Sequence, residues 1–466
     1  MPVALHPRAA PPGELQVWLG ATGPPTGRGP EWRLDGVITV PRIVRPFAAG
    51  PGGAFTGLFS FPGVVPGSVH EVAVGTGTEL ATLRVRALPA EVPADGFETF
   101  NVLLVSCFHR DEDKTGNAGR VVGQLPVKPD LTLLMGDQVY LDLPTLADFK
   151  SEDPRWLAGK FQTDYVRNWI EPRGYAQILH AAPSAAIPDD HEYWNNAPHP
   201  SPVVPDTWHD QRRANWQRVA GQMYDAFQLS APGRERMLTL DVAPLSFFLM
   251  DNRTFRRTDR SATLHPTGLQ QLRSWVDGVI AGERYGVIVT GQSLFQKATP
   301  WLQGRLADRH LADYDDYPAI MAEILRLARS GRPALCLTGD VHYGQVVTAT
   351  EAGTGAQLHE VISSPSSLVT TVGKDQFSSV ISGIGGLFGH GDPNRRHRNA
   401  PPVENPPGLS LHRHYPRHGE KGDHVVLLRF RRSGFGLDMS VTYYMIDAKQ
   451  PGAAQPVATI ALKPSL

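Results

Sequence analysis

Five continuous apolar runs constrain the fold of this chain more than any other sequence feature. They lie at 101–107, 130–137, 243–251, 284–292 and 333–340. Apolar runs without alternation are typical of strands that are buried on both faces, as in the parallel sheet of an α/β protein. Segments with helical periodicity lie between them, so we predict an α/β fold in which helices cover a sheet.

Two of the segments between the runs are expected to be helices. In 209–229, large apolar residues recur at the spacing of one helix face: Trp216, Val219, Met223 and Phe227. In 315–331, Asp316 is placed to cap the start of a helix and Gly331 to end it.

Residues from about 14 to 97 follow a different pattern, in which short extended runs are separated by turns rich in Gly and Pro. The run 79–88 alternates, with Leu83 and Val85 on one face and Arg84 on the other, which is typical of a strand with one face in water. About six or seven such strands predict a β-sandwich of the immunoglobulin or fibronectin III kind.

We therefore predict two domains, an all-β sandwich at 1–97 and a larger α/β domain at 98–466. Within the second, residues 371–423 show no periodicity and are rich in Gly, Pro, Arg and His. Long segments without secondary structure are uncommon in compact domains, and many are functional. We interpret 371–423 as a loop-rich insertion or a lid.

Charge and composition exclude several classes of protein. The chain has 45 Lys and Arg against 46 Asp and Glu, a net charge of −1, which argues against nucleic-acid or membrane-surface binding because both need a positive field. It has no run of about 18 apolar residues that could span a membrane. Its first twenty residues show neither the pattern of a signal peptide nor a twin-arginine pair, so we expect a cytoplasmic protein. Two cysteines, Cys107 and Cys336, exclude a disulfide framework.

Nearly every apolar run ends in polar residues that can bind a metal ion. In chain order they are Ser106 and Cys107; Asp137 and Tyr140; Asp189, Asp190, His191, Glu192, Asn195 and Asn196; and Asp340 and His342. In open α/β sheets ligands bind beyond the carboxyl ends of the strands, so parallel strands would bring these clusters to one edge. Each cluster alone has an ordinary explanation as a turn or a core residue, but their combination favours a metal site.

The donor types predict two different metal ions. The softer or more covalent donors are Cys107, Tyr140 and His342. A tyrosine, with a pKa of about 10, becomes a ligand only under a strong Lewis acid, which favours ferric iron. Asp190, Asp340 and amide oxygens suit a harder ion such as Ca²⁺ or Mn²⁺, and Asp137 would bridge the two sites. Two ions about 3.5–4 Å apart clamp the attacking and leaving oxygens of a phosphoryl displacement.

The order of the motifs resembles the PhoD-like alkaline phosphatases (alkaline phosphatase D), a branch of the calcineurin-like metallophosphoesterases. The matching segments are SC at 106–107, GDQVY at 136–140, DDHEYWNN at 189–196, MDNRTFR at 250–256 and LTGDVHYG at 337–344. The resemblance implies a metallophosphoesterase-type α/β sandwich preceded by an all-β sandwich domain. It also implies hydrolysis of phosphate monoesters or diesters of small molecules, by a hydroxide that bridges two or more metal ions.

The resemblance also assigns roles to individual residues. Iron(III) would be held by Cys107, Asp137, Tyr140 and His342, and calcium by Asp190, Asp340 and either Asn195 or Asn196, with Mn or Zn as alternative metals. His191 would donate the proton to the leaving group. Arg253 would bind the phosphate, for which a guanidinium is well suited. Alternatively, Arg253 would form an ion pair with Asp251 that determines the conformation of the loop.

The sequence lacks complete motifs of other enzyme classes. Residues 291–295 lack the last Gly of a G-x-S-x-G elbow, residues 383–388 lack the last Gly of G-x-G-x-x-G, and there is no G-K-[ST] phosphate loop. Serine hydrolases, dehydrogenases and NTPases are therefore disfavoured. The alternative from another class is a non-catalytic binding or structural protein that retains the phosphatase fold. The natural substrate and the oligomeric state stay open at this stage.

Overall fold

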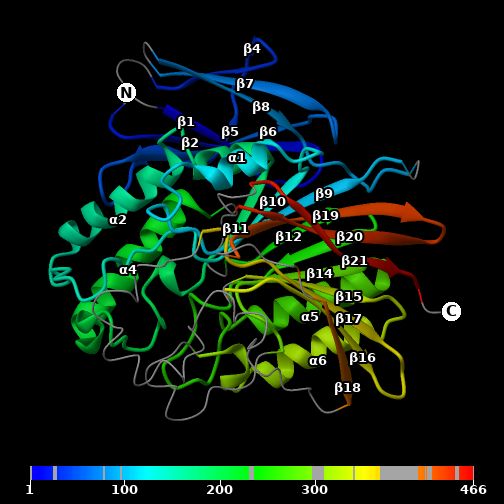
Figure 1. The fold of residues 1–466 in the computed structure, drawn as a ribbon. Coiled ribbons are helices and arrows are strands. Elements are labelled where there is room, and N and C mark those ends of the chain that lie inside the picture. The colour runs from blue at the N-terminus through cyan, green and yellow to red at the C-terminus, as the bar shows by residue number, and fades with distance from the viewer. Residues whose placement is uncertain are drawn as a thin grey trace.

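The computed structural model describes eleven stretches of the chain. They are residues 3–24, 29–76, 79–94, 97–229, 236–295, 309–339, 342–367, 408–414, 416, 422–446 and 451–464. In these stretches the chain forms a mixed α/β structure with two large sheets and one small sheet (Figure 1). No helix of the described residues is long and apolar enough to cross a membrane.

The first sheet has ten strands in the order β21-β20-β19-β9-β10-β11-β1-β2-β6-β5. The strands are β21 (Ala454–Leu462), β20 (Gly436–Met445), β19 (His424–Ser433), β9 (Phe100–Val105), β10 (Leu131–Met135), β11 (Ser184–Ile187), β1 (Val3–Arg8), β2 (Glu14–Ala21), β6 (Phe55–Pro62) and β5 (Arg42–Ala49). Strands β9, β10 and β11 run parallel to one another. A parallel pair between Arg8 and Ser184 joins the N-terminal strands to them.

The second sheet has seven strands in the order β12-β13-β14-β15-β17-β16-β18. They are β12 (Leu238–Val242), β13 (Leu245–Leu249), β14 (Tyr285–Thr290), β15 (Ala334–Thr338), β17 (Gln357–Ile362), β16 (Gln345–Glu351) and β18 (Leu409–His414). Strands β13, β14, β15 and β17 run parallel. The five apolar runs are confirmed as buried strands, but they are divided between the two sheets, with β9 and β10 in the first and β13, β14 and β15 in the second.

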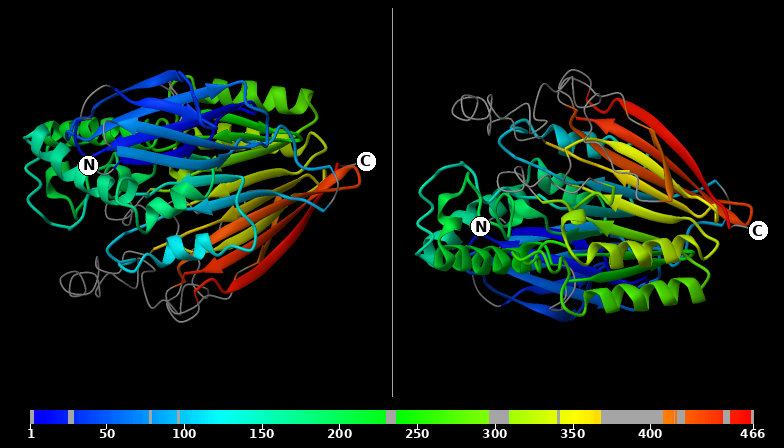
Figure 2. Two further views of the ribbon diagram at one scale, coloured as in Figure 1. Left: turned by 90° about the horizontal axis from the view of Figure 1, so that it is seen from above. Right: turned by 90° about the horizontal axis from the view of Figure 1, so that it is seen from below.

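The two large sheets face each other across an apolar layer, and helices cover their outer faces. Val102 and Leu133 of the first sheet share this inner core with Phe247 and Leu335 of the second. The helices are α1 (Asn117–Gly123), α2 (Pro154–Trp169), α3 (Tyr175–Ala181), α4 (Asp210–Phe227), α5 (Gly268–Ala281) and α6 (Tyr317–Ala328). Helices α1 to α4 pack on the ten-stranded sheet, and α5 and α6 cover the seven-stranded sheet, as the view from below in Figure 2 shows.

The N-terminal strands are divided between the ten-stranded sheet and a third, small sheet. The third sheet, in the order β4-β3-β7-β8, consists of β4 (Val37–Ile38), β3 (Glu31–Leu34), β7 (Val69–Thr76) and β8 (Glu79–Arg86). Val17 and Phe59 of the ten-stranded sheet share a buried core with Trp32 and Val72 of this small sheet. Because β1, β2, β5 and β6 also belong to the ten-stranded sheet, the domain boundary at residue 97 stays a prediction.

Both predicted helices are present, but one predicted cap is wrong. Helix α4 buries the apolar face expected for 209–229. Helix α6 begins directly after Asp316, yet the Asp316 carboxylate does not cap it. That carboxylate instead accepts hydrogen bonds from the backbone N and the hydroxyl of Thr263. A competing partner from a distant segment has replaced the local cap.

Most of the predicted insertion at 371–423 lies outside the described residues. Its stretch 409–414 is described, and here the prediction of a loop is wrong, because these residues form β18 and pair with β16. Leu409 and Leu411 alternate with polar residues and pack against the core under α5 and α6. The high density of Arg and His around them hides this short alternation in the sequence. The interpretation as a lid stays a prediction.

Candidate active site

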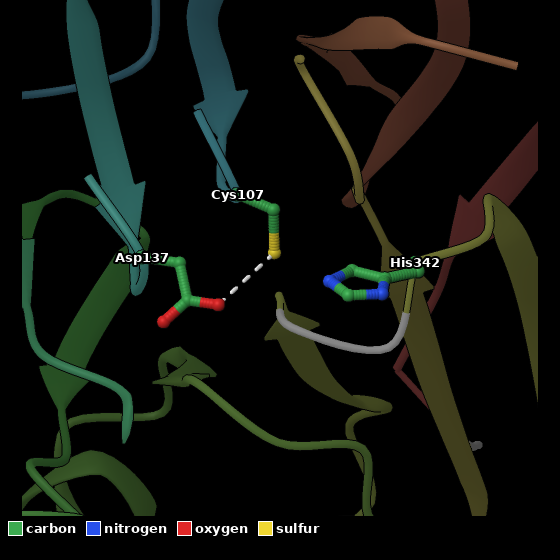
Figure 3. Close-up of side chains that lie close together, drawn as sticks. All are labelled: Cys107, Asp137 and His342. Carbon is green, nitrogen blue, oxygen red and sulfur yellow. Dashed lines mark hydrogen bonds between the residues drawn. The ribbon is translucent and has the colours of Figure 1, made fainter. Parts of the chain in front are cut away.

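Polar side chains from both large sheets meet at one edge of the molecule. Cys107 and Asp137 each follow a strand of the first sheet, β9 and β10, by two residues. His342 follows β15 of the second sheet. One ligand atom from each of the three lies within 4.8 Å of the others, as Figure 3 shows for the three side chains. The predicted convergence at strand ends therefore occurs, with the carboxyl ends of parallel strands from two sheets facing each other.

A second cluster shares Asp137 with the first. Ligand atoms of Asp137, Asp190 and His191 also lie within 4.8 Å of one another. Asp190 and His191 lie in the 3₁₀ turn η1 (Asp190–Glu192), which comes shortly after β11. Asp137 is the residue that the sequence predicts to bridge two metal sites, and it is the member that both clusters have in common.

The backbone is strained at four of the residues predicted to bind metals. Cys107, Asp137, Asn196 and His342 have φ of 51°, 60°, 71° and 56°, in the left-handed region that non-glycine residues rarely adopt. Each such residue costs about 1–3 kcal/mol and persists only where the surrounding structure enforces it. Positive φ also occurs away from this edge, for example at Asp35, but at this edge the four residues all carry potential metal-binding side chains.

Ser364 links the side chain of Cys107 to the backbone of His342. Its hydroxyl donates to Cys107 Sγ at 3.1 Å and accepts from the backbone N of His342 at 3.0 Å. The Cys107 thiol in turn donates to Asp137 Oδ2 at 3.5 Å. Sequence reasoning did not identify Ser364. The signal was present, since the apolar run of β17 ends in serines directly after Ile362.

His191 forms a buried pair with Asp142, a residue that the sequence analysis did not single out. The ring Nδ1 lies 2.8 Å from Asp142 Oδ1, and Asp142 Oδ2 accepts the backbone N–H of Asn195 at 2.8 Å. Burial by itself lowers the pKa of His191, but the negative charges of Asp142 and Asp190 outweigh it and raise that pKa to about 9. Without bound metal ions, the ring of His191 is therefore cationic at neutral pH.

Tyr140 lies between two histidines. Its ring centroid is 4.2 Å from that of His191 and 5.4 Å from that of His109. Burial lowers the pKa of His109, which keeps this second ring neutral at pH 7. Arg110, the next residue, forms an ion pair with Glu171.

The two asparagines considered as ligands differ in their surroundings. The side-chain oxygen of Asn195 accepts a hydrogen bond from Ser201 Oγ at 3.4 Å. The side-chain oxygen of Asn196 is buried and has no hydrogen-bond partner among the described residues. The backbone N of Asn196 donates to Asp190 Oδ2 at 2.7 Å. These contacts favour Asn196 over Asn195 as a metal ligand. The sequence alone offers no reason to choose between the two asparagines. Asp340 lies outside the described residues.

Arg253 is fully buried and held by protein groups. Its Nε donates to Asp189 Oδ1, its Nη1 donates to the carbonyl of Ala197 at 2.9 Å, and its Nη2 lies 3.9 Å from Asp190 Oδ1. The expected partner Asp251 accepts the backbone N–H of Arg253 instead. The guanidinium therefore braces the turn before Asp190, and its predicted contact with substrate stays a prediction.

Fold and site together define a mixed α/β protein with a cluster of carboxylate, thiol and imidazole groups where two sheets meet. A solved structure described as "Structure of PhoD" aligns with 99% of this chain and 93% of that chain, at 14% sequence identity and a TM-score of 0.58. The chain therefore has a PhoD-like fold, as the order of its motifs implied. An amylomaltase from Corynebacterium glutamicum aligns with a TM-score of only 0.15 and carries no argument. No family model and no curated protein matches the sequence.

Proposed function

We propose that this chain is a metal-dependent phosphoesterase that hydrolyses phosphate monoesters or diesters of small molecules. The observation that carries the proposal is the position of Asp137, which belongs to both clusters of potential metal ligands. The PhoD-like fold supports the class of reaction. It also supports the finer assignment of a metallophosphoesterase sandwich with an N-terminal β domain.

The residues present fit bound metal ions. Asp137 and Asp190 are 0% and 2% exposed, and metal cations would add to the compensation of their negative charge that the His191 ring and the Arg253 guanidinium provide. The buried oxygen of Asn196, which has no hydrogen-bond partner among the described residues, is a further donor that a metal ion would satisfy. The Cys107 thiol, which follows β9 of the first sheet, and the His342 imidazole, which follows β15 of the second, complete the set.

The chemical types of the donor atoms determine which ion we propose for each of the two metal sites. Cys107, Tyr140 and His342 would hold iron(III) together with Asp137. Asp190 and an asparagine, with Asp340, would hold calcium, and Mn or Zn are the alternatives. Bound metal ions lower the pKa of water and neutralise charge on a phosphate group.

The chain itself supplies a proton donor. Asp142 holds the Nδ1 proton of His191, so Nε2 is the ring nitrogen that remains to transfer a proton to the leaving alkoxide. The raised pKa keeps this proton in place at neutral pH. Asp142 fixes the ring through its second oxygen as well, because that oxygen is tied to the backbone of Asn195.

The test is hydrolysis of nitrophenyl phosphate and bis-nitrophenyl phosphate by protein of known metal content. We expect turnover of at least one substrate, and loss of turnover when chelators remove the metals. Absence of turnover on both substrates, in protein that contains iron and calcium, would contradict the proposal and favour a non-catalytic binding protein with the same fold.

A further inference from the structure

Glu192 joins the two turns that carry the carboxylates of the site. Its side chain is fully buried, and four N–H groups donate to its two oxygens. Oε2 accepts from the backbone N of Asp137 and of Asp189, both at 2.8 Å. Oε1 accepts from the backbone N of Gln138 at 2.6 Å and from Nε2 of Gln228 at 3.1 Å. One carboxylate therefore binds the turn after β10, the turn after β11 and the end of α4.

The four donors favour an ionised carboxylate, and they act against burial, which raises the pKa of Glu192 to about 7. Three of the four donors are backbone N–H groups, which cannot become acceptors. Oε2 faces two backbone N–H groups and Oε1 faces one, so a group that itself donates is unfavourable at either position. Hydrogen bonds from several donors to a charged acceptor also offset the cost of burying the charge.

The two turns also touch directly. Gly136 has a φ of 93°, and a Cβ added there would lie 2.6 Å from the Cβ of Asp189. Asp137, the next residue, has the strained φ of 60°. The close approach and the strain both need a restraint that holds the turns together, and the Glu192 carboxylate provides one.

We propose that Glu192 is a positioning residue that fixes Asp137 relative to Asp190 and so sets the metal affinity of the site, without itself contacting metal or substrate. The effect on metal affinity rests on the proposed function. The effect on the geometry of the two turns does not. Polar groups behind metal ligands commonly change metal affinity by about 10–100-fold when they are altered.

A Glu192→Gln variant tests this with little change in volume. Whichever oxygen the amide replaces, its NH₂ group faces at least one backbone N–H donor. Glu360→Gln is a matched control. Glu360 is equally buried, but accepts one backbone N–H, from Leu294 at 2.7 Å, and one hydroxyl, from Ser293 at 3.1 Å. A glutamine there keeps both contacts, because its oxygen accepts the N–H and its NH₂ donates to the hydroxyl, which can rotate.

The measurement is titration of Mn²⁺ into metal-stripped protein by calorimetry. We expect E192Q to bind at least about tenfold more weakly than the wild type, and E360Q to bind as the wild type does. Wild-type Mn²⁺ affinity in folded E192Q would overturn the proposal.

Hydrogen exchange provides a second test that needs neither metal nor substrate, and it covers the case in which E192Q does not fold. In wild-type protein we expect the amides of Asp137, Gln138 and Asp189 to exchange as slowly as those in the middle of β10. Fast exchange, as at an ordinary turn, would overturn the proposal. Slow exchange in a protein that binds no Mn²⁺ would support the positioning of the turns and contradict the proposed function, so the two failures are distinguishable.

Discussion

Asp142 Oδ1 lies 2.8 Å from His191 Nδ1, in a buried pair that joins the turn after β10 to the turn after β11. The charge of His191 holds the pKa of Asp142 below its usual value although burial acts in the opposite direction. Asp142 and its neighbours in turn raise the pKa of His191 to about 9. The pair therefore provides an imidazolium whose free nitrogen can act as a general acid.

Replacing Asp142 with Asn should move the alkaline limit of activity. His191 donates its proton only while it is protonated, so activity that depends on it is present below a pKa of about 9 and falls as the pH rises through that value. Without the carboxylate, the pKa of His191 falls toward its ordinary value of about 6.5, and the alkaline limb should shift to lower pH. A pH profile of kcat/KM measures the shift, and an unchanged limb in D142N would contradict the assignment.

His191→Ala should affect substrates according to their leaving group. Alkyl phosphates have poor leaving groups and need the proton, so we expect a loss of about 10²–10⁴-fold for them. Nitrophenyl phosphate has a good leaving group and should lose much less. Equal losses on both substrates would indicate that His191 binds a metal ion instead.

Tyr140→Phe tests the identity of the first metal. If Tyr140 binds ferric iron as phenolate, the wild-type protein absorbs visible light through phenolate-to-iron charge transfer, and the variant should lose this band. The measurement is an absorption spectrum at matched iron content. A colourless wild-type protein with full activity would favour a pair of Zn²⁺ or Mn²⁺ ions.

Arg253→Met separates a structural role from a contact with substrate. The variant leaves Asp189 as a buried charge without its guanidinium partner, and breaking a buried pair in this way costs about 3–5 kcal/mol. We therefore expect a large fall in Tm. A rise in KM for phosphate esters at unchanged Tm would instead support the phosphate-binding role predicted from the sequence.

The sequence predicts much of the site because the ligand-bearing residues follow buried strands. Cys107 and Asp137 follow β9 and β10, and parallel strands present their carboxyl ends at one edge whatever the details of packing. The sequence does not reveal that β9 and β15 belong to different sheets, because buried strands look alike wherever they lie.

Residues that act through tertiary contacts were harder to predict. Asp142 and Ser364 become recognisable only when distant segments are brought together, as 49 residues separate Asp142 from His191 and 257 separate Ser364 from Cys107. For the same reason the predicted local cap at Asp316 was wrong, since its carboxylate binds Thr263. The local sequence pattern shows which residue types follow a strand. Tertiary packing determines which groups those residues hydrogen-bond to.

The most direct test of the central claim is the metal content and turnover of Asp137→Asn beside Asp130→Asn. Asp130 is a matched control, because it is a buried carboxylate at the opposite end of β10 that accepts the backbone N–H of Asn101 and pairs with Arg86. If Asp137 serves two metal sites, D137N should lose metal from both and with it nearly all turnover of nitrophenyl phosphate, whereas D130N should retain both metals and turnover. A D137N protein with the metal content and turnover of the wild type would contradict the account.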